Sequence, residues 1–196
     1  DSIDGQVFSY RGASYAIPLL GEHQLHNAAT VLEAVSVLRK LGWDIDDEAV
    51  ESGLYSVAWP ARFEVLHTDD PWFVLDGGHN PQCAAALREC LEHYFPDSKR
   101  VALVGVLKDK DYKSIAATLA PLFDACVCVT PPSERALPAE ELAELFKDSC
   151  REVCVVDTVE DGVDLARDIA QEQDAMVCAF GSLYICGQIR SCFGLR

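Results

Sequence analysis

The sequence predicts an α/β protein built on a Rossmann-like, mainly parallel sheet with helices on both faces. From residue 71 onward, apolar runs of four to six residues alternate with segments of helical periodicity. Such alternation is typical of parallel strands that are buried on both sides and joined by helices. Apolar residues make up 49% of the 196 residues, which is enough to build a sizeable core.

The N-terminal part of the chain has a different texture. Loose alternation around a glycine at 6–20 predicts a hairpin. Apolar residues at helical spacing predict a helix that starts at Asn27 and stops at Gly42. The next predicted elements are a short helix at 46–53, a strand at 63–66 and a turn at 69–71.

A domain boundary is expected where this texture changes, near residues 67–71, which gives domains of 1–68 and 69–196. In the second domain, five strands are predicted at 72–76, 100–107, 125–130, 152–156 and 175–180. Helices are predicted at 81–95, 111–121, 138–148, 159–172 and 182–192. Because parallel strands need crossover connections, these helices should join the strands by right-handed crossovers.

The composition limits which kinds of partner and which cellular compartment are expected. A net charge of −16 repels phosphate backbones, which argues against nucleic acid as the main partner. The nine cysteines are odd in number, lie in apolar runs and form no CxxC pair. They therefore resemble the buried thiols of a cytoplasmic protein rather than disulfides or a zinc site.

Neither a membrane span nor a signal peptide is expected, because no apolar run approaches the length of about 18 residues that a spanning helix needs. The chain begins mid-pattern and without a methionine. We therefore expect it to be part of a longer protein.

Polar residues and glycines follow four of the predicted strands. In an open parallel sheet, ligands bind at the carboxyl ends of the strands, so these loops are candidate binding elements. They are DGGHN at 76–80, GVLKDKD at 105–111, TPPS at 130–133 and GS at 181–182.

The first of these loops, 76–80, combines a tight turn with polar groups. Gly77 and Gly78 allow the backbone to turn sharply and to approach a ligand closely. Asn80 suits the N-cap and Pro81 the first turn of the next helix, whose N-terminus favours an anion. Turn chemistry alone would explain the same pattern. No GxGxxG or GxxxxGK[ST] motif is present, so the loop is neither a dinucleotide fingerprint nor a phosphate loop.

Several segments together are more specific than any one of them. GEHQLHNAA at 21–29, WPARFEVL at 59–66 and LDGGHNP at 75–81 occur in order and at sensible separation. Together they resemble the folylpolyglutamate synthase/dihydrofolate synthase branch of the Mur ligase superfamily. GVLKDKDY at 105–112 and FGSLYICGQIR at 180–190 are similar to later motifs of that family. The resemblance extends over essentially the whole chain.

This resemblance implies that residues 1–68 are the tail of the family's central ATPase domain and residues 69–196 its Rossmann-like glutamate-ligase domain. The phosphate loop, the main Mg²⁺ ligands and a carbamylated lysine would then lie upstream, in the protein's own N-terminal domain, with no metal ligand in this chain. The implied full-length enzyme is a cytoplasmic ligase of folate biosynthesis. It would use ATP and Mg²⁺ to join L-glutamate to folate or dihydropteroate through an acyl phosphate. The chain alone is expected to be inactive.

The resemblance also implies roles in nucleotide binding. Asn27 corresponds to an asparagine near the ATP base, and His23 and Gln24 to supports of the nucleotide loop. Arg62 corresponds to a catalytic arginine that reaches the ATP phosphates, and Asp76 to an acid at the ribose. Bidentate arginine suits phosphate better than lysine does.

Further residues are implied at the amino-acid substrate. His79, which is also assigned to catalysis, and Asn80 match positions near the incoming glutamate or the phosphate. Ser182 matches a serine at the glutamate carboxylate, whose charge Lys110 could neutralise.

Structural alternatives remain open for several of these residues. Asn27 and Ser182 could each serve only as a helix cap. Arg62 could serve only in an exposed ion pair with Glu64 or another acid. Trp59 is expected to be a packing anchor rather than a stacking platform.

The sequence departs from the family's pattern at two positions. Ala61 replaces the glycine of WPGR, so the backbone there either avoids positive φ or is strained. Gly78 replaces the alanine of DGAHN, which loosens the turn and removes no chemical group. Two other functions stay open: a Mur peptide ligase of cell-wall synthesis, and a non-catalytic module that binds a nucleotide or another small ligand.

Overall fold

The computed structural model describes residues 2–67, 69 and 71–195. The chain divides into two compact units, residues 1–60 and residues 61–196. The first unit contains a hairpin of β1 (Gln6–Tyr10) and β2 (Ala13–Ile17), followed by α1 (Glu22–Lys40) and α2 (Asp47–Tyr55). The predicted hairpin and both predicted helices are confirmed.

Helix α1 begins five residues earlier than its apolar spacing predicts, at Glu22 rather than at Asn27. The reason lies in the turn before it. Gly21 adopts a φ of 99°, and its carbonyl oxygen accepts a hydrogen bond from the N–H of Gln24 at 2.9 Å. A buried Gln6 amide fastens the same turn by donating to the carbonyl oxygens of Leu19 and Gly21 at 2.7 and 3.1 Å. Asn27 therefore lies inside the helix, and the alternative that it caps this helix is wrong.

The second unit is a six-stranded sheet of order β3-β4-β8-β5-β6-β7. All neighbours in it are parallel except the edge strand β3, which is antiparallel to β4. The predicted mainly parallel sheet is confirmed. Its strands are β3 (Glu64–His67), β4 (Phe73–Asp76), β5 (Lys99–Val104), β6 (Ala125–Val129), β7 (Glu152–Val156) and β8 (Ala175–Phe180).

The pairing of β3 with β4 moves the boundary between the units. Since β3 belongs to the sheet, the second unit begins at Ala61 and not at residue 69. The predicted turn at 69–71 includes residue 70, which lies outside the described residues.

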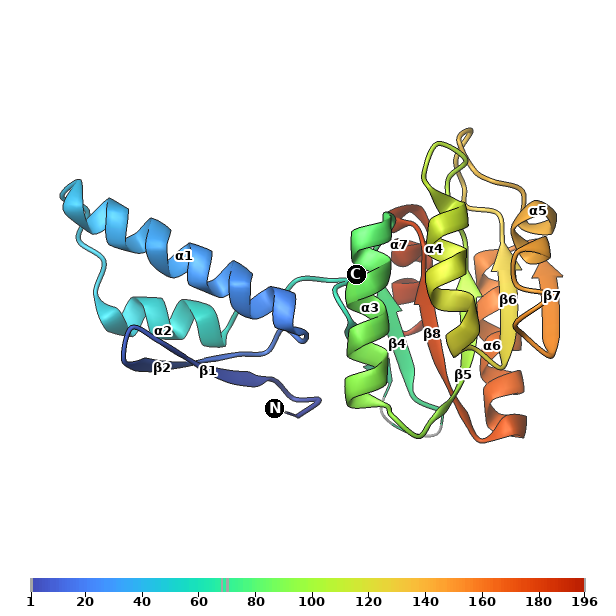
Figure 1. Cartoon of the computed structure of the whole chain (residues 1–196), viewed down its shortest axis with the longest axis horizontal. Coiled ribbons are helices and arrows are strands. Elements are labelled where there is room, and N and C mark those ends of the chain that lie inside the picture. The colour runs from blue at the N-terminus through green and yellow to red at the C-terminus, as the bar shows by residue number, and fades with distance from the viewer. Residues whose placement is uncertain (1, 68, 70, 196) are drawn as a thin grey trace. The chain divides into compact units, whose positions relative to one another are not determined.

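Helices cover both faces of this sheet, as predicted. In Figure 1, α3 and α4 lie over one face, and α6 and α7 lie over the other. Because β8 inserts between β4 and β5, the chain after β7 must return past β6 and β5, and α6, which makes this return, lies on the opposite face. The helices are α3 (Pro81–Tyr94), α4 (Tyr112–Leu119), α5 (Ala139–Glu144), α6 (Val159–Gln173) and α7 (Leu183–Cys192).

The helix predicted at 111–121 ends early because of the proline at position 121. Pro121 has no N–H to donate to a preceding carbonyl, so α4 stops at Leu119 and a 3-10 turn follows at Ala120–Leu122. Strand β5 likewise ends at Val104 rather than at residue 107. The main core lies between the sheet and its helices, with Leu75, Leu103 and Ile185 among its fully buried members.

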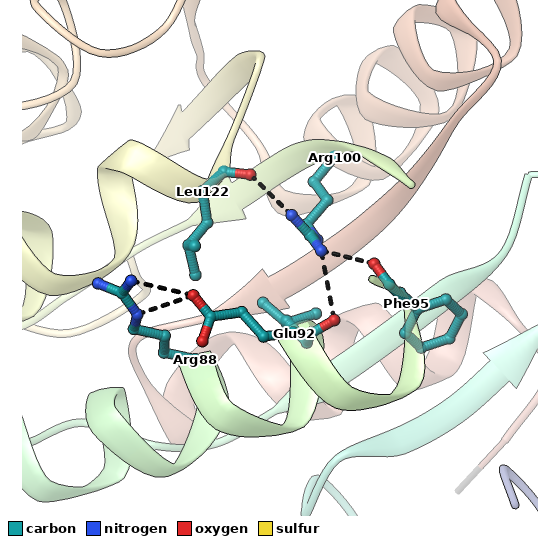
Figure 2. A network of polar contacts seen from close by, with 6 residues as sticks. Arg88, Glu92, Phe95, Arg100 and Leu122 are labelled. Atoms are coloured by element: carbon teal, nitrogen blue, oxygen red, sulfur yellow. Dashed lines mark hydrogen bonds and ion pairs between the residues drawn. The ribbon is translucent and has the colours of Figure 1, made fainter. Parts of the chain in front are cut away.

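A buried arginine stabilises the C-terminal end of α3. Arg100, at the start of β5, is only 9% exposed. Its Nη2 donates to the carbonyl oxygens of Leu91 and Phe95 at 3.3 and 2.5 Å, and its Nη1 to that of Leu122 at 3.5 Å (Figure 2). Two of these carbonyls belong to the C-terminal end of α3, where a cation also complements the helix dipole.

Replacing Arg100 with methionine should lower the free energy of unfolding by about 3 kcal/mol, because buried hydrogen bonds to a charged group are lost together. Arg88→Met is the matched control. It removes an exposed pair with Glu92 on the same helix, 3.0 Å apart, and should cost about 0.5 kcal/mol or less. Urea denaturation of both variants measures the difference. Equal losses would show that the carbonyl contacts of Arg100 do not stabilise the fold.

Within the described ranges, no helix has both the length and the apolar character needed to cross a membrane.

Candidate functional site

Three adjacent strands of the sheet end at the same level. Asp76, the last residue of β4, is in register with Phe180 of β8, and Phe180 is in register with Val104 of β5. The loops that follow these strands therefore lie side by side. Their approach is close: a Cβ on Gly181, which has a φ of 110°, would lie 2.7 Å from the carbonyl oxygen of Gly105. Only glycine fits at position 181.

The loop after β4 is packed equally tightly. The N–H of Gly77 donates to the carbonyl oxygen of Ala61 at 2.8 Å. A Cβ on Gly77 would lie 2.4 Å from Cδ2 of Leu183 and 3.3 Å from Nη1 of Arg62. The Arg62 guanidinium and the first residue of α7 therefore both lie against this loop. A Cβ on Gly78 would lie 2.6 Å from Oδ1 of Asp76 and 2.8 Å from Cβ of Cys83, so an alanine there would require these side chains to shift.

Asp76 organises the backbone around it. Its Oδ2 accepts from the N–H of Phe63 at 2.9 Å, and its Oδ1 accepts from the N–H of Gly78 at 2.7 Å. The carboxylate thus joins the segment before β3 to the loop after β4.

Arg62 sits at the top of a strained arch, defined as Ala61-Arg62-Phe63. Ala61 and Phe63 have φ values of 55° and 43°, in the left-handed region that disfavours residues with a side chain. Of the two outcomes left open for Ala61, the structure shows the strained one. Such conformations cost about 1–3 kcal/mol each and persist only where their surroundings enforce them.

The alternative that Arg62 pairs with Glu64 is not seen. The Glu64 carboxylate binds Nη1 of Arg190 through one oxygen and the N–H of Ala61, at 2.8 Å, through the other. The Arg62 Nη1 donates only to its neighbour, the carbonyl oxygen of Ala61, at 3.2 Å. Among the described residues, no carboxylate forms an ion pair with Arg62.

His79 and Asn80 follow directly. A carbonyl oxygen can only accept, so the contact of 3.0 Å between Nδ1 of His79 and the oxygen of Gly77 requires the proton on Nδ1. Nε2 of the neutral ring is then the acceptor. The Asn80 side chain accepts from the N–H of Cys83 at 2.8 Å, and Pro81 occupies the first turn of α3. The predicted N-cap is confirmed.

Ser182 begins α7 in the same way. It is only 2% exposed, and its Oγ accepts from the N–H of Tyr184 at 3.2 Å. The helix-cap alternative is therefore realised at Ser182, which leaves its hydroxyl proton available to a second partner. Two helix N-termini, those of α3 and α7, begin at this edge of the sheet and favour an anion there.

Lys110 lies in the loop between β5 and α4, after the third of these adjacent strands. Its N–H donates to the carbonyl oxygen of Leu107 at 3.2 Å, and its side chain is half-buried. Next to it, Asp109 pairs with Arg135 at 3.4 Å. The loop is thus held by contacts with the segment before α5.

Three predicted site residues belong to the first unit, on the first turns of α1. Gln24 is buried, and its Oε1 accepts from Nδ2 of Asn27 at 3.0 Å, while His23 and Asn27 are exposed. The remaining predicted residues belong to the second unit. Trp59 is 61% exposed, so it is not the packing anchor that was predicted.

Two buried thiols close enough to Asp76 to feel its charge, Cys90 and Cys186, have raised pKa values and are unreactive. Burial, and to a smaller extent the Asp76 carboxylate, raises the pKa of Cys90 to about 12. Burial and Asp76 also raise the pKa of Cys186 to about 12, opposed by the Arg62 guanidinium. Neutral thiols are poor nucleophiles and poor metal ligands. Within the part of the chain that the structure describes, no group of three or more His, Cys, Asp or Glu side chains could hold a metal ion.

Two residues of this network were not predicted. Glu64 and Arg190 lie in the segments WPARFEVL and FGSLYICGQIR, but Glu64 was considered only as a partner of Arg62, and Arg190 was assigned no role. Their contact spans 126 positions of the chain, a distance at which residue spacing carries no information.

Residues 61–183, more than half of the chain, match the family described as Mur ligase, glutamate ligase domain. The chain belongs to the Mur ligase family. Within this family it is similar to the folylpolyglutamate and dihydrofolate synthases, as the resemblance implied. It is 33% identical to the dihydrofolate synthase/folylpolyglutamate synthase of Mycobacterium tuberculosis, over 98% of this chain and 44% of that protein.

Solved structures of Mur ligase family members agree. A structure titled as Mycobacterium tuberculosis folylpolyglutamate synthase complexed with ADP and AMPPCP superimposes with a TM-score of 0.89 and 32% identity, over 100% of this chain and 46% of that one. A Yersinia pestis bifunctional folylpolyglutamate synthase/dihydrofolate synthase with Mn, AMPPNP and L-glutamate bound gives 0.72 and 29%, over 98% of this chain and 45% of that one. The chain spans less than half the length of these relatives.

Proposed function

We propose that this chain is the C-terminal part of an ATP-dependent ligase that adds L-glutamate to folate or dihydropteroate. Its similarity to folylpolyglutamate and dihydrofolate synthases supports the substrate class. Because the chain spans under half the length of those proteins, the activity belongs to the longer protein, and the chain alone is inactive. In this proposal, the first unit is the tail of the central ATPase domain and the second is the glutamate-ligase domain.

One observation carries the proposal: the state of Arg62. Its guanidinium lies at the carboxyl edge of the sheet, against the loop of Gly77, and no carboxylate of the described residues pairs with it. In a chain of net charge −16, such a cation is available to an anionic ligand. A phosphate group of ATP matches its charge and its paired donors.

Arg62 stabilises charge on the phosphoryl oxygens as the γ-phosphate is transferred. The nucleotide roles proposed for the other residues rest on the resemblance to the family. Asp76 accepts hydrogen bonds from the ribose hydroxyls at the edge of the sheet where it already binds two backbone N–H groups. Asn27, whose amide both donates and accepts, recognises the base, and His23 and Gln24 support the turn that carries it.

The loops before α3, α4 and α7 bind glutamate and position the reacting groups. A carboxylate oxygen of the folate substrate attacks the γ-phosphorus, and ADP leaves. The amine of glutamate then attacks the carbonyl carbon of this acyl phosphate, inorganic phosphate departs, and the amine loses its proton. His79, with Nε2 as an acceptor, and Asn80 position the amine and the phosphate, while Ser182 and Lys110 bind a carboxylate of glutamate.

Magnesium belongs to this proposal through the longer protein. A divalent ion would neutralise phosphate charge during transfer. The resemblance to the family assigns its main ligands to the N-terminal region of the longer protein, and no residue of this chain is proposed as a ligand. A Yersinia pestis relative is described as complexed with AMPPNP and a Mn ion.

The test is a substrate comparison with the full-length protein that contains this chain. ADP release that depends on glutamate should occur with dihydropteroate or a folate, and not with a muramyl peptide precursor. Release only with the muramyl precursor would identify a cell-wall peptide ligase instead. Binding of ATP with no turnover of either substrate would favour a non-catalytic module.

A further inference from the structure

The ion pair between Glu64 and Arg190 differs from the other ion pairs of the described residues. Its side chains are 23% and 13% exposed, whereas both partners of every other such pair are at least 38% exposed. It joins β3 to the last turn of α7. A partly buried pair of opposite charges is costly to break, because the remaining charge is left without compensation.

This pair is connected directly to the strained arch of Ala61-Arg62-Phe63. One Glu64 oxygen contacts Arg190, and the other accepts from the N–H of Ala61 at 2.8 Å. The N–H of Phe63 donates to Asp76 at 2.9 Å. Each of the two left-handed residues is therefore held by a carboxylate, one before Arg62 and one after it.

The strain gives these contacts a mechanical role. The left-handed region disfavours residues with side chains, so the arch would relax if one of its ends were released. Without Arg190, the Glu64 carboxylate would gain by turning toward water. The N–H of Ala61 would then lose its acceptor, and Arg62 would lose its fixed direction.

Helix α7 does not need Arg190 for its own packing. Ile185 and Ile189 on this helix are fully buried in the core, and Ser182 caps its N-terminus. The packing of α7 therefore fixes the position from which Arg190 contacts Glu64.

We propose that Arg190, acting through Glu64, is a positioning residue that holds the arch in the conformation that presents Arg62 to the phosphates of ATP. This inference rests on the proposed function. It assigns to the FGSLYICGQIR segment a second role beside that of Ser182: fixing the phosphate-binding arginine from the opposite end of α7.

The first experiment asks whether the arch loosens. Amide hydrogen exchange of this chain is compared for wild type, Arg190→Met and the control Arg88→Met, which removes an exposed pair on α3. In Arg190→Met, exchange at Ala61 should accelerate about tenfold or more, while that of the β5 and β8 ladder amides stays unchanged. Unchanged exchange at Ala61, or equal acceleration throughout the unit, would overturn the proposal.

The second experiment asks whether the effect acts through Arg62. The Kd for ATP is measured by calorimetry on the full-length protein, without folate or glutamate. Arg190→Met and Glu64→Gln should each weaken binding about tenfold, and the double variant no further, because both break the same connection. In an Arg62→Ala background, Arg190→Met should change the Kd by less than about twofold. A purely structural role would weaken binding equally in both backgrounds.

The proposed nucleotide site and the positioning role of Arg190 can be tested separately. If Arg62→Ala leaves the Kd for ATP unchanged, the proposed nucleotide site is wrong. If Arg62→Ala weakens binding and Arg190→Met does not, only the positioning role is wrong.

Discussion

Replacing Arg62 with alanine in the full-length protein should lower kcat/KM for ATP by about a thousandfold. The guanidinium is the cation that the carboxyl edge of the sheet presents, and removing one preorganised donor to developing oxyanion charge costs factors of this order. The fold should survive, because among the described residues the Arg62 side chain forms a single hydrogen bond, of 3.2 Å, to its neighbour's carbonyl oxygen. Steady-state kinetics with varied ATP measure the loss.

Arg62→Lys is the matched variant. It keeps the charge but loses the planar pair of donors, so its activity should fall between that of wild type and Arg62→Ala. The free energy of unfolding of all three should agree within about 1 kcal/mol. Near-normal turnover of Arg62→Ala would remove this residue from the site, and a large loss of stability would mean that activity fell for a structural reason.

The layered fold could be predicted because its strands are buried on both faces. Continuous apolar runs such as ACVCV and AMVCAF have no polar face to confuse the assignment, and all five parallel strands are found. The errors lie where a single residue controls the backbone. Gly21 starts α1 early, and Pro121 ends α4 early, because glycine and proline act through φ and the missing N–H rather than through apolar spacing.

Which residues lie at the candidate site could also be predicted in part. That Asn80 caps α3 and that polar loops share one edge follow from turn chemistry and sheet topology. The roles themselves came from the resemblance. The two backbone bonds of Asp76 and the strain at Ala61 could not be predicted, because both depend on the contact between the segment before β3 and the loop after β4.

The chain should unfold steeply as the pH rises above about 9. Six thiols are buried in the second unit, and the pKa values of five of them are raised: Cys90, Cys126, Cys150, Cys178 and Cys186. Burial raises the pKa of Cys90 and Cys186 to about 12 and that of Cys150 to about 11. It also raises the pKa of Cys126 and Cys178 well above the ordinary value.

The sign of the effect follows from proton binding. A thiol of the unfolded chain ionises near pH 8.5, whereas each buried thiol keeps its proton to a higher pH. Below pH 8.5 both states are protonated, and stability does not depend on these groups. Above it the unfolded state loses protons that the folded state retains, so each thiol lowers the free energy of unfolding by about 1 kcal/mol per pH unit. Five together approach the whole stability of a typical domain, about 5–15 kcal/mol, between pH 9 and pH 10.

Urea denaturation between pH 7.5 and pH 10 would measure this slope, and two variants on α3 separate ionisation from packing. Cys90→Ala removes one thiol and should reduce the slope by about 1 kcal/mol per pH unit. Leu87→Ala, which opens a cavity from the same buried face of the helix, should lower stability by about 3 kcal/mol at every pH and leave the slope unchanged. Equal slopes in Cys90→Ala and Leu87→Ala would mean that groups other than this thiol control the alkaline transition. A smaller slope in Cys90→Ala alone would show that the alkaline loss of stability depends on the thiol proton of Cys90, which the folded state retains and the unfolded state loses.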